Sequence, residues 1–360
     1  MNELKLGELF CGPGGISLGA EMANLELAEE LNTKIKHAWA VDYHRPTVDT
    51  FIENISGASK ESVFCADVRN FDFKQLKKIS DIDGFAYGFP CNDYSLVGEQ
   101  KGLNGEFGPL YKYGVEILKL FNPKFFIAEN VGGLRGSHNG EALRQIINDL
   151  SVAGKGYEIT PHLYKFEEYG VPQCRHRIIL VGLRKDLKLK FKPPAPTHID
   201  NFLSCKDAIT KPAIPPSAYN NELTQQHPRV VERLKHILPG ENAWTANLPD
   251  NLKLNVKGAK LSQIYKRLDP NKPSYTITGS GGGGTHVYHW KEPRALTNRE
   301  RARLQTFPDN FKFCGSKEDI RRQIGMAVPP HATKLIFESI IKTLEGINYP
   351  SVEANLTNFK

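Results

Sequence analysis

The first half of the sequence alternates short apolar segments with segments of helical spacing, and this pattern limits the fold most. The apolar segments, which we expect to be strands, are residues 5–10, 35–42, 83–90, 124–131 and 175–183. Between them, apolar residues recur at helical spacing in residues 16–31, 46–55, 113–121 and 141–150. Strands that alternate with helices predict an α/β fold with a mostly parallel sheet and helices on both faces.

The alternation ends after Leu183, where the chain becomes proline-rich and basic. Between Arg184 and Lys272 there are 16 Lys and Arg residues against 8 Asp and Glu, an excess of +8 that is larger than the net charge of +7 of the whole chain. Such a segment predicts a smaller, irregular domain and favours a polyanionic partner, although a solvated lysine-rich surface is the alternative. Regular structure is expected to resume at Thr297, which starts a T-x-x-E capping box, and to end with a helix over residues 331–346.

The bulk composition excludes several classes of protein. A hydrophobic content of 40% and a charged content of 24% are ordinary for a globular protein, and there is no apolar run of membrane-spanning length. The six cysteines are scattered and form no C-x-x-C pair, so neither a zinc site nor a disulfide framework is expected. The N-terminus shows no secretion signal, and we expect a cytoplasmic protein with reduced thiols.

A glycine loop follows the first expected strand and opens the first expected helix. Its spacing, G-x-G-G-x-x-x-G over residues 12–19, differs from the G-x-G-x-x-G of dinucleotide enzymes and argues against an NAD-dependent dehydrogenase. Asp42 ends the second expected strand, where a carboxylate is well placed to accept hydrogen bonds from ribose hydroxyls. The loop and Asp42 together favour a cofactor that contains a nucleoside.

A cysteine, Cys91, comes directly after another expected strand, and Glu129 lies near the end of the next one. Ligands of open α/β sheets bind beyond the carboxyl ends of the strands, so both residues are expected at the same rim as the glycine loop. A lone cysteine is more often a small buried apolar residue. A thiolate that adds to C6 of cytosine, helped by a carboxyl group at N3, would however make C5 nucleophilic toward a methyl group from a sulfonium donor.

At this point the sequence resembles the DNA (cytosine-5) methyltransferases of the bacterial restriction-modification type. The matching segments, in the order of the family motifs, are ELFCGPGGISLG, VDYHRPTVDTFIEN, CADVRN, GFPCNDYS, FIAENV, VPQCRHRIILVG, RALTNRERARLQTFPDNF and QIGMAVPP. The resemblance covers nearly the whole chain outside the basic segment. It implies a Rossmann-like domain that binds S-adenosylmethionine, with a smaller irregular target-recognition domain, and base flipping of a cytosine from duplex DNA.

The resemblance also implies roles for individual residues. Cys91 would be the nucleophile at C6, and Glu129 would bind N3 and the exocyclic amine of cytosine. Arg177 would contact O2 of the base, while Arg175 would support the site; on one strand, both arginines would point the same way. The residues expected to bind the cofactor are Phe10, Gly12, Gly15, Asp42, Tyr43, Asp67 and Pro90.

The family further implies a division into domains and a set of partners. Residues 1–183 and 291–350 would form the catalytic S-adenosylmethionine-binding domain, and residues 184–290 the target-recognition domain. The expected substrate is double-stranded DNA at one short sequence. We also expect a monomer with no metal ion and no membrane association, in the bacterial cytoplasm on nucleoid DNA, with a restriction endonuclease acting as a separate protein.

Some positions depart from the usual family pattern. They are Glu8 for aspartate, Cys11 for alanine, Asn92 for glutamine, Tyr94 for phenylalanine and Met326 for asparagine. A thioether cannot reproduce the hydrogen bonds of an asparagine side chain, so Met326 leaves open a weakly active or non-catalytic DNA-binding relative. An RNA cytosine-5 methyltransferase is the other alternative, against which the long basic segment argues.

Overall fold

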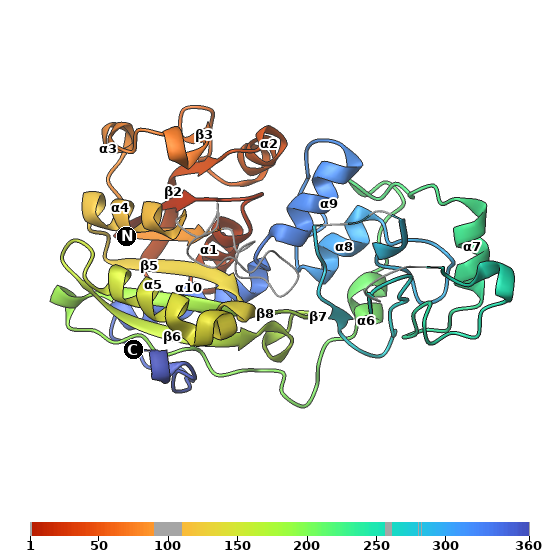
Figure 1. Cartoon of the computed structure of the whole chain (residues 1–360). Helices are drawn as coiled ribbons and strands as arrows, with labels where there is room; N and C mark the ends of the chain where they lie inside the picture. The colour runs from red at the N-terminus through yellow and green to blue at the C-terminus, as the bar shows by residue number, and fades with distance from the viewer. Residues whose placement is uncertain (1, 90–109, 256–260, 280, 282, 360) are drawn as a thin grey trace. The chain divides into compact units, whose positions relative to one another are not determined.

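A computed structural model describes residues 2–89, 110–255, 261–279, 281 and 283–359 (Figure 1). The chain divides into two units, which we call unit 1 and unit 2. Unit 1 comprises Met1–Lys165, His176–Pro196 and Pro330–Lys360, and unit 2 comprises Phe166–Arg175 and Thr197–Pro329. Four residues singled out in the sequence, Pro90, Cys91, Asn92 and Tyr94, lie outside the described residues.

Unit 1 is built on a seven-stranded sheet in the order β3-β2-β1-β4-β5-β8-β6. Its strands are β1 (Asn2–Leu9), β2 (Thr33–Asp42), β3 (Val63–Cys65), β4 (Gly84–Gly88), β5 (Phe125–Val131), β6 (Tyr157–Lys165) and β8 (His176–Arg184). Strands β1 to β5 pair in parallel, while β8 runs antiparallel to both β5 and β6. The predicted mostly parallel α/β fold is therefore confirmed. The sequence analysis missed β6, a strand that contains a proline, Pro161.

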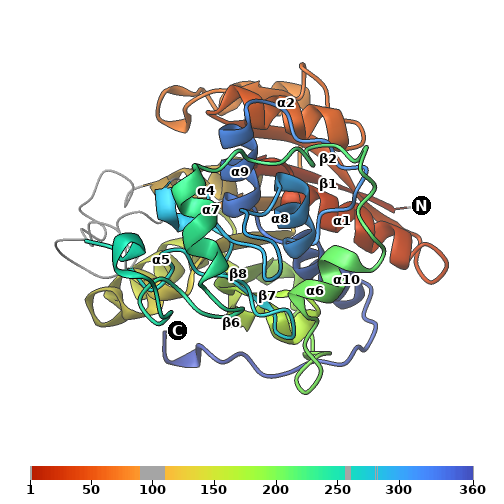
Figure 2. The ribbon, with the colours of Figure 1, turned by 90° about the vertical axis from the view of Figure 1, so that its right-hand side faces the viewer.

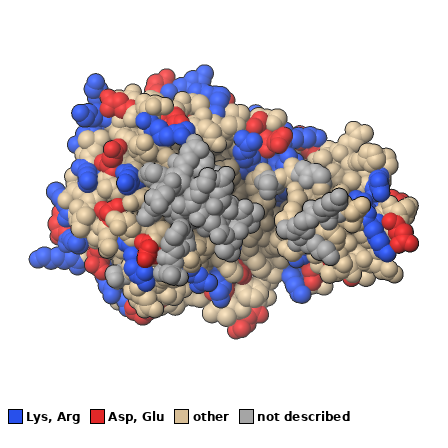
Figure 3. Space-filling view, in the orientation of Figure 1, with Lys and Arg blue, Asp and Glu red and all other residues tan. Residues whose placement is uncertain are grey.

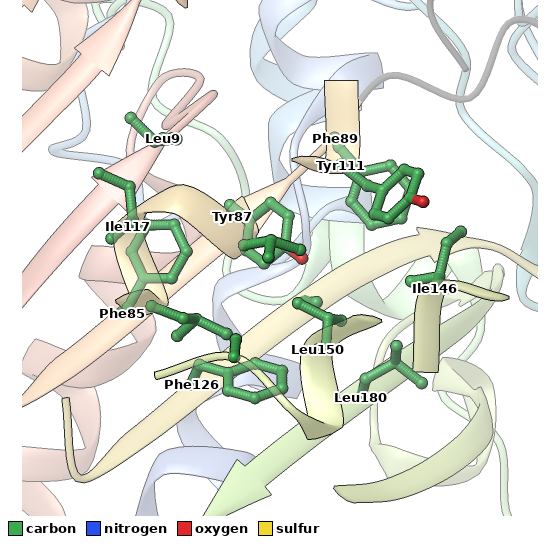
Figure 4. Packing of buried hydrophobic residues seen from close by; sticks show 14 of the residues in the cluster. Leu9, Phe85, Tyr87, Phe89, Tyr111, Ile117, Phe126, Ile146, Leu150 and Leu180 are labelled. Atoms are coloured by element: carbon green, nitrogen blue, oxygen red, sulfur yellow. The ribbon is translucent and has the colours of Figure 1, made fainter. Parts of the chain in front are cut away.

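Helices cover both faces of this sheet, and two consecutive phenylalanines show how. Phe126 of β5 packs on one face in a large apolar cluster with residues of α3, α4 and α5, and its ring meets Tyr157 edge-on at 5.2 Å. Phe125, one position earlier, points to the other face and contacts Phe337 of α10 at 6.4 Å between ring centroids. Figure 4 shows the first of these clusters, with Ile117 and Leu150 near the strand residues. The helices of unit 1 are α1 (Gly15–Glu26), α2 (Arg45–Asn54), α3 (Lys74–Ile79), α4 (Tyr111–Phe121), α5 (Glu141–Ser151) and α10 (Pro330–Leu344).

The last glycine of the glycine loop brings α1 and α10 together. A Cβ atom at Gly19 would lie 2.0 Å from Thr333 Oγ1 and 2.8 Å from the backbone nitrogen of Lys334. The Thr333 hydroxyl also donates a hydrogen bond of 3.2 Å to the carbonyl of Gly15. Gly19 therefore serves helix packing, which the sequence pattern alone did not separate from ligand binding.

Unit 2 contains short elements joined by long irregular segments (Figure 2). They are β7 (Gln173–Cys174), β9 (Ser274–Tyr275), α6 (Cys205–Thr210), α7 (Pro228–Lys235), α8 (Asn298–Leu304) and α9 (Lys317–Met326). Its small core contains Leu234, Tyr265 and Tyr288, and buried Arg267 ties it together by donating to backbone carbonyls, including that of Leu234 at 3.0 Å. The predicted capping box is present at the start of α8. None of the helices in the described ranges is long and apolar enough to cross a membrane.

We expect the substitution Gly19→Ala to destabilise unit 1 by about 1–3 kcal/mol, because the added methyl group meets backbone atoms of α10 that cannot move aside. Denaturant unfolding followed by circular dichroism measures this change. The matched control is Gly136→Ala, since a Cβ at Gly136 has no heavy atom within 4 Å. Equal stability of the two variants would show that the approach of α1 to α10 is not as close as described.

Candidate active site

The candidate residues of unit 1 gather at the edge of the sheet where the parallel strands end. The glycine loop follows β1, Asp42 ends β2, Asp67 follows β3, and Glu129 lies in the last half of β5. Strands β1 and β4 are neighbours, and the chain order reverses between them. Ligands of open α/β sheets bind at such a reversal, outside the carboxyl ends of the strands.

The glycine loop has a left-handed backbone that its sequence permits. Gly12 and Gly14 adopt φ values of 56° and 98°, which glycine reaches at no steric cost. Phe10 also has a positive φ of 52°, an uncommon conformation for a bulky residue and one that often marks functional sites. The loop therefore leaves β1 by a sharp turn before α1 begins, and internal hydrogen bonds such as the one from the Gly14 N–H to the Cys11 carbonyl hold that turn.

Asp42 holds this loop in place. One carboxylate oxygen accepts a hydrogen bond from the backbone N–H of Gly12 and the other from that of His44, each at 3.0 Å. The side chain is largely buried, and burial raises the pKa of Asp42 while the two N–H groups oppose that rise. The sequence suggested a ribose ligand for Asp42, but it did not reveal this second task of fixing the turn.

Tyr43 and Asp67 lie close to Asp42 along the same edge. The backbone N–H of Ala66 donates to the carbonyl of Asp42 at 2.9 Å, which joins the ends of β2 and β3. Tyr43 is 63% exposed, so its ring is available to a ligand. Asp67 accepts a backbone hydrogen bond from Arg69 at 3.0 Å and forms an ion pair with its guanidinium at 2.7 Å, and these hydrogen bonds lower the pKa of Asp67. Sequence reasoning missed Arg69 as the partner of Asp67.

Glu129 and Arg177 form an ion pair at the end of β5. The distance from Arg177 Nε to Glu129 Oε1 is 2.9 Å, and each side chain is 13% exposed. In the sheet Gly88 of β4 is paired with Glu129, and a Cβ at Gly88 would lie 3.3 Å from Glu129 Oε2. The carboxyl group of Glu129 therefore lies directly beside Gly88, the last residue of β4. Cys91 follows Gly88 by three positions in the sequence.

A buried amide fixes the end of β4. Asn130, which is 3% exposed, donates from Nδ2 to the carbonyl of Phe89 at 3.1 Å. Phe89 is the last described residue before the gap, and Pro90 and Cys91 follow it outside the described residues. Asn130 is a positioning residue that sequence reasoning missed, although the family motif that includes Glu129 contained it.

Arg175 has a different environment from Arg177. It is 2% exposed within unit 2, and its guanidinium donates to the backbone carbonyls of Ile277 at 3.1 Å and of Ala327 at 2.9 Å. The expectation that one strand holds both arginines is wrong, because β8 begins only at His176. Arg175 therefore ties the segment after β9 to the end of α9, consistent with a cation at a helix C-terminus.

Two buried glutamines extend this network in unit 2. Gln173 Nε2 donates to Gln305 Oε1 at 2.9 Å, and Gln173 Oε1 accepts from the backbone N–H of Ile277 at 2.8 Å. The sequence analysis quoted Gln173 within a family motif but gave it no role, and it did not identify Gln305 as a buried partner. Met326, the departure from the family pattern, ends α9 with a side chain that is 62% exposed and near Gly279.

Glu8 is an acid buried under the glycine loop. It is 1% exposed, and Ser17 of α1 donates its hydroxyl to Oε1, whereas Oε2 has no hydrogen-bond partner among the described residues. Burial raises the pKa of Glu8 to about 8, so the carboxyl group is mostly protonated at neutral pH. A neutral acid at this position avoids the cost of a buried charge that has a single hydroxyl partner.

We expect Glu8→Gln to change the pH dependence of stability. The wild-type folded state holds a proton on Glu8 that the unfolded state releases above about pH 4.5, so its stability should fall as pH rises toward about 8. Glutamine removes this dependence. The free energy of unfolding of Glu8→Gln, relative to wild type, should therefore rise between pH 5 and pH 8 by more than about 1.4 kcal/mol, the value of one pKa unit.

Urea unfolding at several pH values measures the effect. The matched control is Glu3→Gln on the same strand, where the side-chain hydrogen bond from Lys36 lowers the pKa of Glu3, so that its charge is constant over this range. A Glu8→Gln profile parallel to that of wild type would contradict a neutral Glu8.

Known proteins resemble this chain over nearly its whole length. The family model of the C-5 cytosine-specific DNA methylases matches residues 4–342. The type II methyltransferase M.BbvI of Brevibacillus brevis is 55% identical over 355 residues, covering 98% of this chain and 94% of the relative. M.NgoFVII of Neisseria gonorrhoeae, also a type II methyltransferase, is 38% identical over 363 residues, covering 98% and 90%.

Solved structures share the fold. A candidate DNA modification methyltransferase encoded within an Escherichia coli prophage matches with a TM-score of 0.71 and 25% identity, covering 95% of this chain and 99% of the other. Dnmt2 of Schizosaccharomyces pombe matches in fold alone, with a TM-score of 0.58 and 15% identity over 97% of this chain and all of the other. Since the family model spans nearly the whole chain and the closely similar relatives are methyltransferases, this chain belongs to the C-5 cytosine-specific DNA methylase family.

Proposed function

We propose that the chain transfers a methyl group from S-adenosylmethionine to C5 of a cytosine in double-stranded DNA, at one short sequence. Membership of the family and the names of the type II methyltransferase relatives support this reaction and its place in a restriction-modification system. The proposed enzyme is a cytoplasmic monomer that acts on nucleoid DNA, needs no metal ion and works apart from a restriction endonuclease.

The observation that carries the proposal is the Glu129–Arg177 pair beside the end of β4. Cytosine presents an amine at N4, a ring nitrogen at N3 and a carbonyl oxygen at O2 along one edge. A protonated carboxyl group accepts a hydrogen bond from the amine at its carbonyl oxygen and donates its O–H to N3. A guanidinium donates to O2. The two side chains therefore offer groups complementary to one cytosine edge, at the place from which the chain continues to Cys91.

Cys91 would act as the nucleophile. Its thiolate adds to C6 while Glu129 supports positive charge at N3, and the ring electrons then make C5 nucleophilic. C5 would then bond to the methyl carbon of the sulfonium, and the electrons of the broken S–CH3 bond would stay on sulfur as a neutral thioether. A base would remove the C5 proton, and the electrons of that C–H bond would re-form the double bond and expel the thiolate. An ordinary thiol is only slightly ionised at neutral pH, so the site must favour the thiolate or remove the proton during attack.

The cofactor would lie over the glycine loop. Bound S-adenosylmethionine supplies an electrophilic methyl group on a sulfonium. Phe10, Gly12 and Gly15 would line its methionine part, and Asp42, with lone pairs beyond those used by Gly12 and His44, would accept from the ribose. The residues proposed to contact the adenine and the methyl-transfer region are Tyr43, Asp67 and Pro90.

Unit 2 would recognise the target sequence. A stacked base cannot reach a thiol, so the cytosine must leave the duplex at a cost of a few kcal/mol, which contacts with the surrounding DNA offset. The basic segment at residues 184–290 falls largely in unit 2. On the face drawn in Figure 3, Lys and Arg side chains are dispersed among Asp and Glu on both units.

Replacing the nucleophile tests the proposed chemistry. We expect Cys91→Ser to lower methylation by roughly 1,000-fold or more, because a hydroxyl is a far weaker nucleophile. Bisulfite sequencing of DNA from expressing cells should show one methylated short sequence for wild type and none for the variant. Cys174→Ser, which changes an exposed thiol, is the control and should methylate normally. Methylation by Cys91→Ser at the wild-type level would exclude Cys91 as nucleophile.

The cofactor assignment has a separate test. Asp42→Ala removes both the expected ribose contact and the tie to Gly12, so we expect the affinity for S-adenosylmethionine to fall by about 10-fold or more. Isothermal titration calorimetry with purified protein measures it. Asp49→Ala, which breaks an exposed ion pair with Arg45 on α2, should bind as wild type does. Unchanged affinity in Asp42→Ala would place the cofactor elsewhere.

A further inference from the structure

Two arginines of unit 2, Arg301 on α8 and Arg321 on α9, lie close together in a largely buried position. Arg301 is 2% exposed, and the side chain of Arg321 is 12% exposed. Arg301 Nη2 is 3.4 Å from His286 Nδ1. Burial and the neighbouring charge of Arg321 lower the pKa of Arg301 to about 10, so both arginines stay charged at neutral pH.

Neither arginine has a close acidic partner among the described residues. Arg301 forms no ion pair there, and Arg321 reaches only Glu318, at 3.9 Å, whose side chain is 72% exposed. The Nε atom of Arg321 is buried without a hydrogen-bond partner among the described residues. His286 supplies no negative charge, and burial together with the two arginines lowers its pKa to about 4.

Three other arginines close to Arg301 in the sequence, Arg294, Arg299 and Arg303, have partners. Arg294 binds Glu300 at 2.7 Å, and Arg303 forms an ion pair with Asp309. Arg299 donates to the backbone carbonyl of Pro308 at 2.9 Å and to two further carbonyls. A buried charge without a close counter-charge costs free energy. Arg301, which has no ion pair among the described residues, and Arg321, whose one acidic neighbour there is 3.9 Å away, therefore point to an anion that binds here.

The backbone of Gly281 lies directly against Arg321. A Cβ at Gly281 would be only 2.7 Å from Arg321 Nε and 2.8 Å from its Cδ, so the backbone here approaches the guanidinium in a way that a side chain would prevent. Glycine-rich backbone also lets a bulky ligand come close to the protein. Gly281 therefore covers Nε of Arg321, and a ligand can reach the exposed 12% of the side chain.

We propose that Arg321, with Arg301 behind it, forms an anion site that receives one phosphate group of the DNA backbone. The assignment rests on the proposed function, because DNA is the polyanion that this function supplies. A guanidinium binds a phosphate through two parallel N–H···O bonds, and such contacts fix the register of a protein on the duplex without reading its sequence. Arg301 adds positive potential from within and needs no direct contact.

Charge-removal variants test the site by DNA binding and by stability. The probe is a pool of 40-bp duplexes of random sequence, which contains every short target, with S-adenosylhomocysteine present and fluorescence anisotropy as the readout at several salt concentrations. We expect Arg321→Gln to weaken binding by about 10-fold or more and to reduce the slope of log K against log salt by about 1. The midpoint of thermal unfolding of the free variant should stay equal or rise, since an unpaired buried charge is removed.

Two further variants make the test specific. Arg322→Gln removes the same charge from the exposed neighbour of Arg321, and its binding should change by less than half as much. Arg301→Met keeps an apolar chain of similar length at the buried position and should also weaken DNA binding without lowering the unfolding midpoint. An arginine that merely supports the fold would show the reverse, with a lower midpoint and unchanged affinity.

The remaining outcomes separate the sources of the anion. If inorganic phosphate, at constant ionic strength, raises the unfolding midpoint of wild type but not of Arg321→Gln while DNA binding of that variant is normal, the site takes free phosphate and the DNA assignment is wrong. If wild type binds DNA and Arg321→Gln binds equally well with no phosphate effect, no anion site exists. Failure of wild type itself to bind the duplex pool would instead overturn the proposed function.

Discussion

The parallel pairing of β4 with β5 is the constraint on which the candidate site depends. It sets Gly88 opposite Glu129, so the carboxyl group lies over the end of β4, and the absence of a side chain at Gly88 leaves it room. Asn130 then holds Phe89 through its side-chain amide. A shift of one residue in this register would pair Glu129 with a different residue of β4 and turn its side chain to the other face of the sheet.

The part of the site proposed to bind the cofactor also depends on a few side-chain contacts. Asp42 fixes the glycine loop through Gly12 and the start of the next segment through His44, so one carboxylate connects two strand ends. Glu8 lies buried beneath the same loop and is kept neutral by its surroundings. The two acids therefore have different tasks for a physical reason: one has N–H partners for both oxygens, and the other has a single hydroxyl partner.

Buried polar side chains contribute to the order of unit 2 beside its apolar residues. Buried polar side chains such as Gln173, Gln305 and Arg175 donate to backbone carbonyls at the C-terminal ends of α8 and α9, where the helices leave these carbonyls without partners of their own. Arg301 differs from Arg294 and Arg303 because it has no ion pair among the described residues, and Arg321 reaches only Glu318, at 3.9 Å. Sites that break a rule obeyed by their neighbours are where function is expected.

The sequence by itself determined the class of fold, the family and the set of candidate residues, because strand and helix periodicities and motif order are local properties of the chain. It also predicted the capping box that starts α8. The tertiary structure alone decided which side chains meet. Gly19 packs helices, Asp42 holds a loop, and Arg175 and Arg177 have separate environments, because each of these outcomes depends on contacts between residues far apart in the chain.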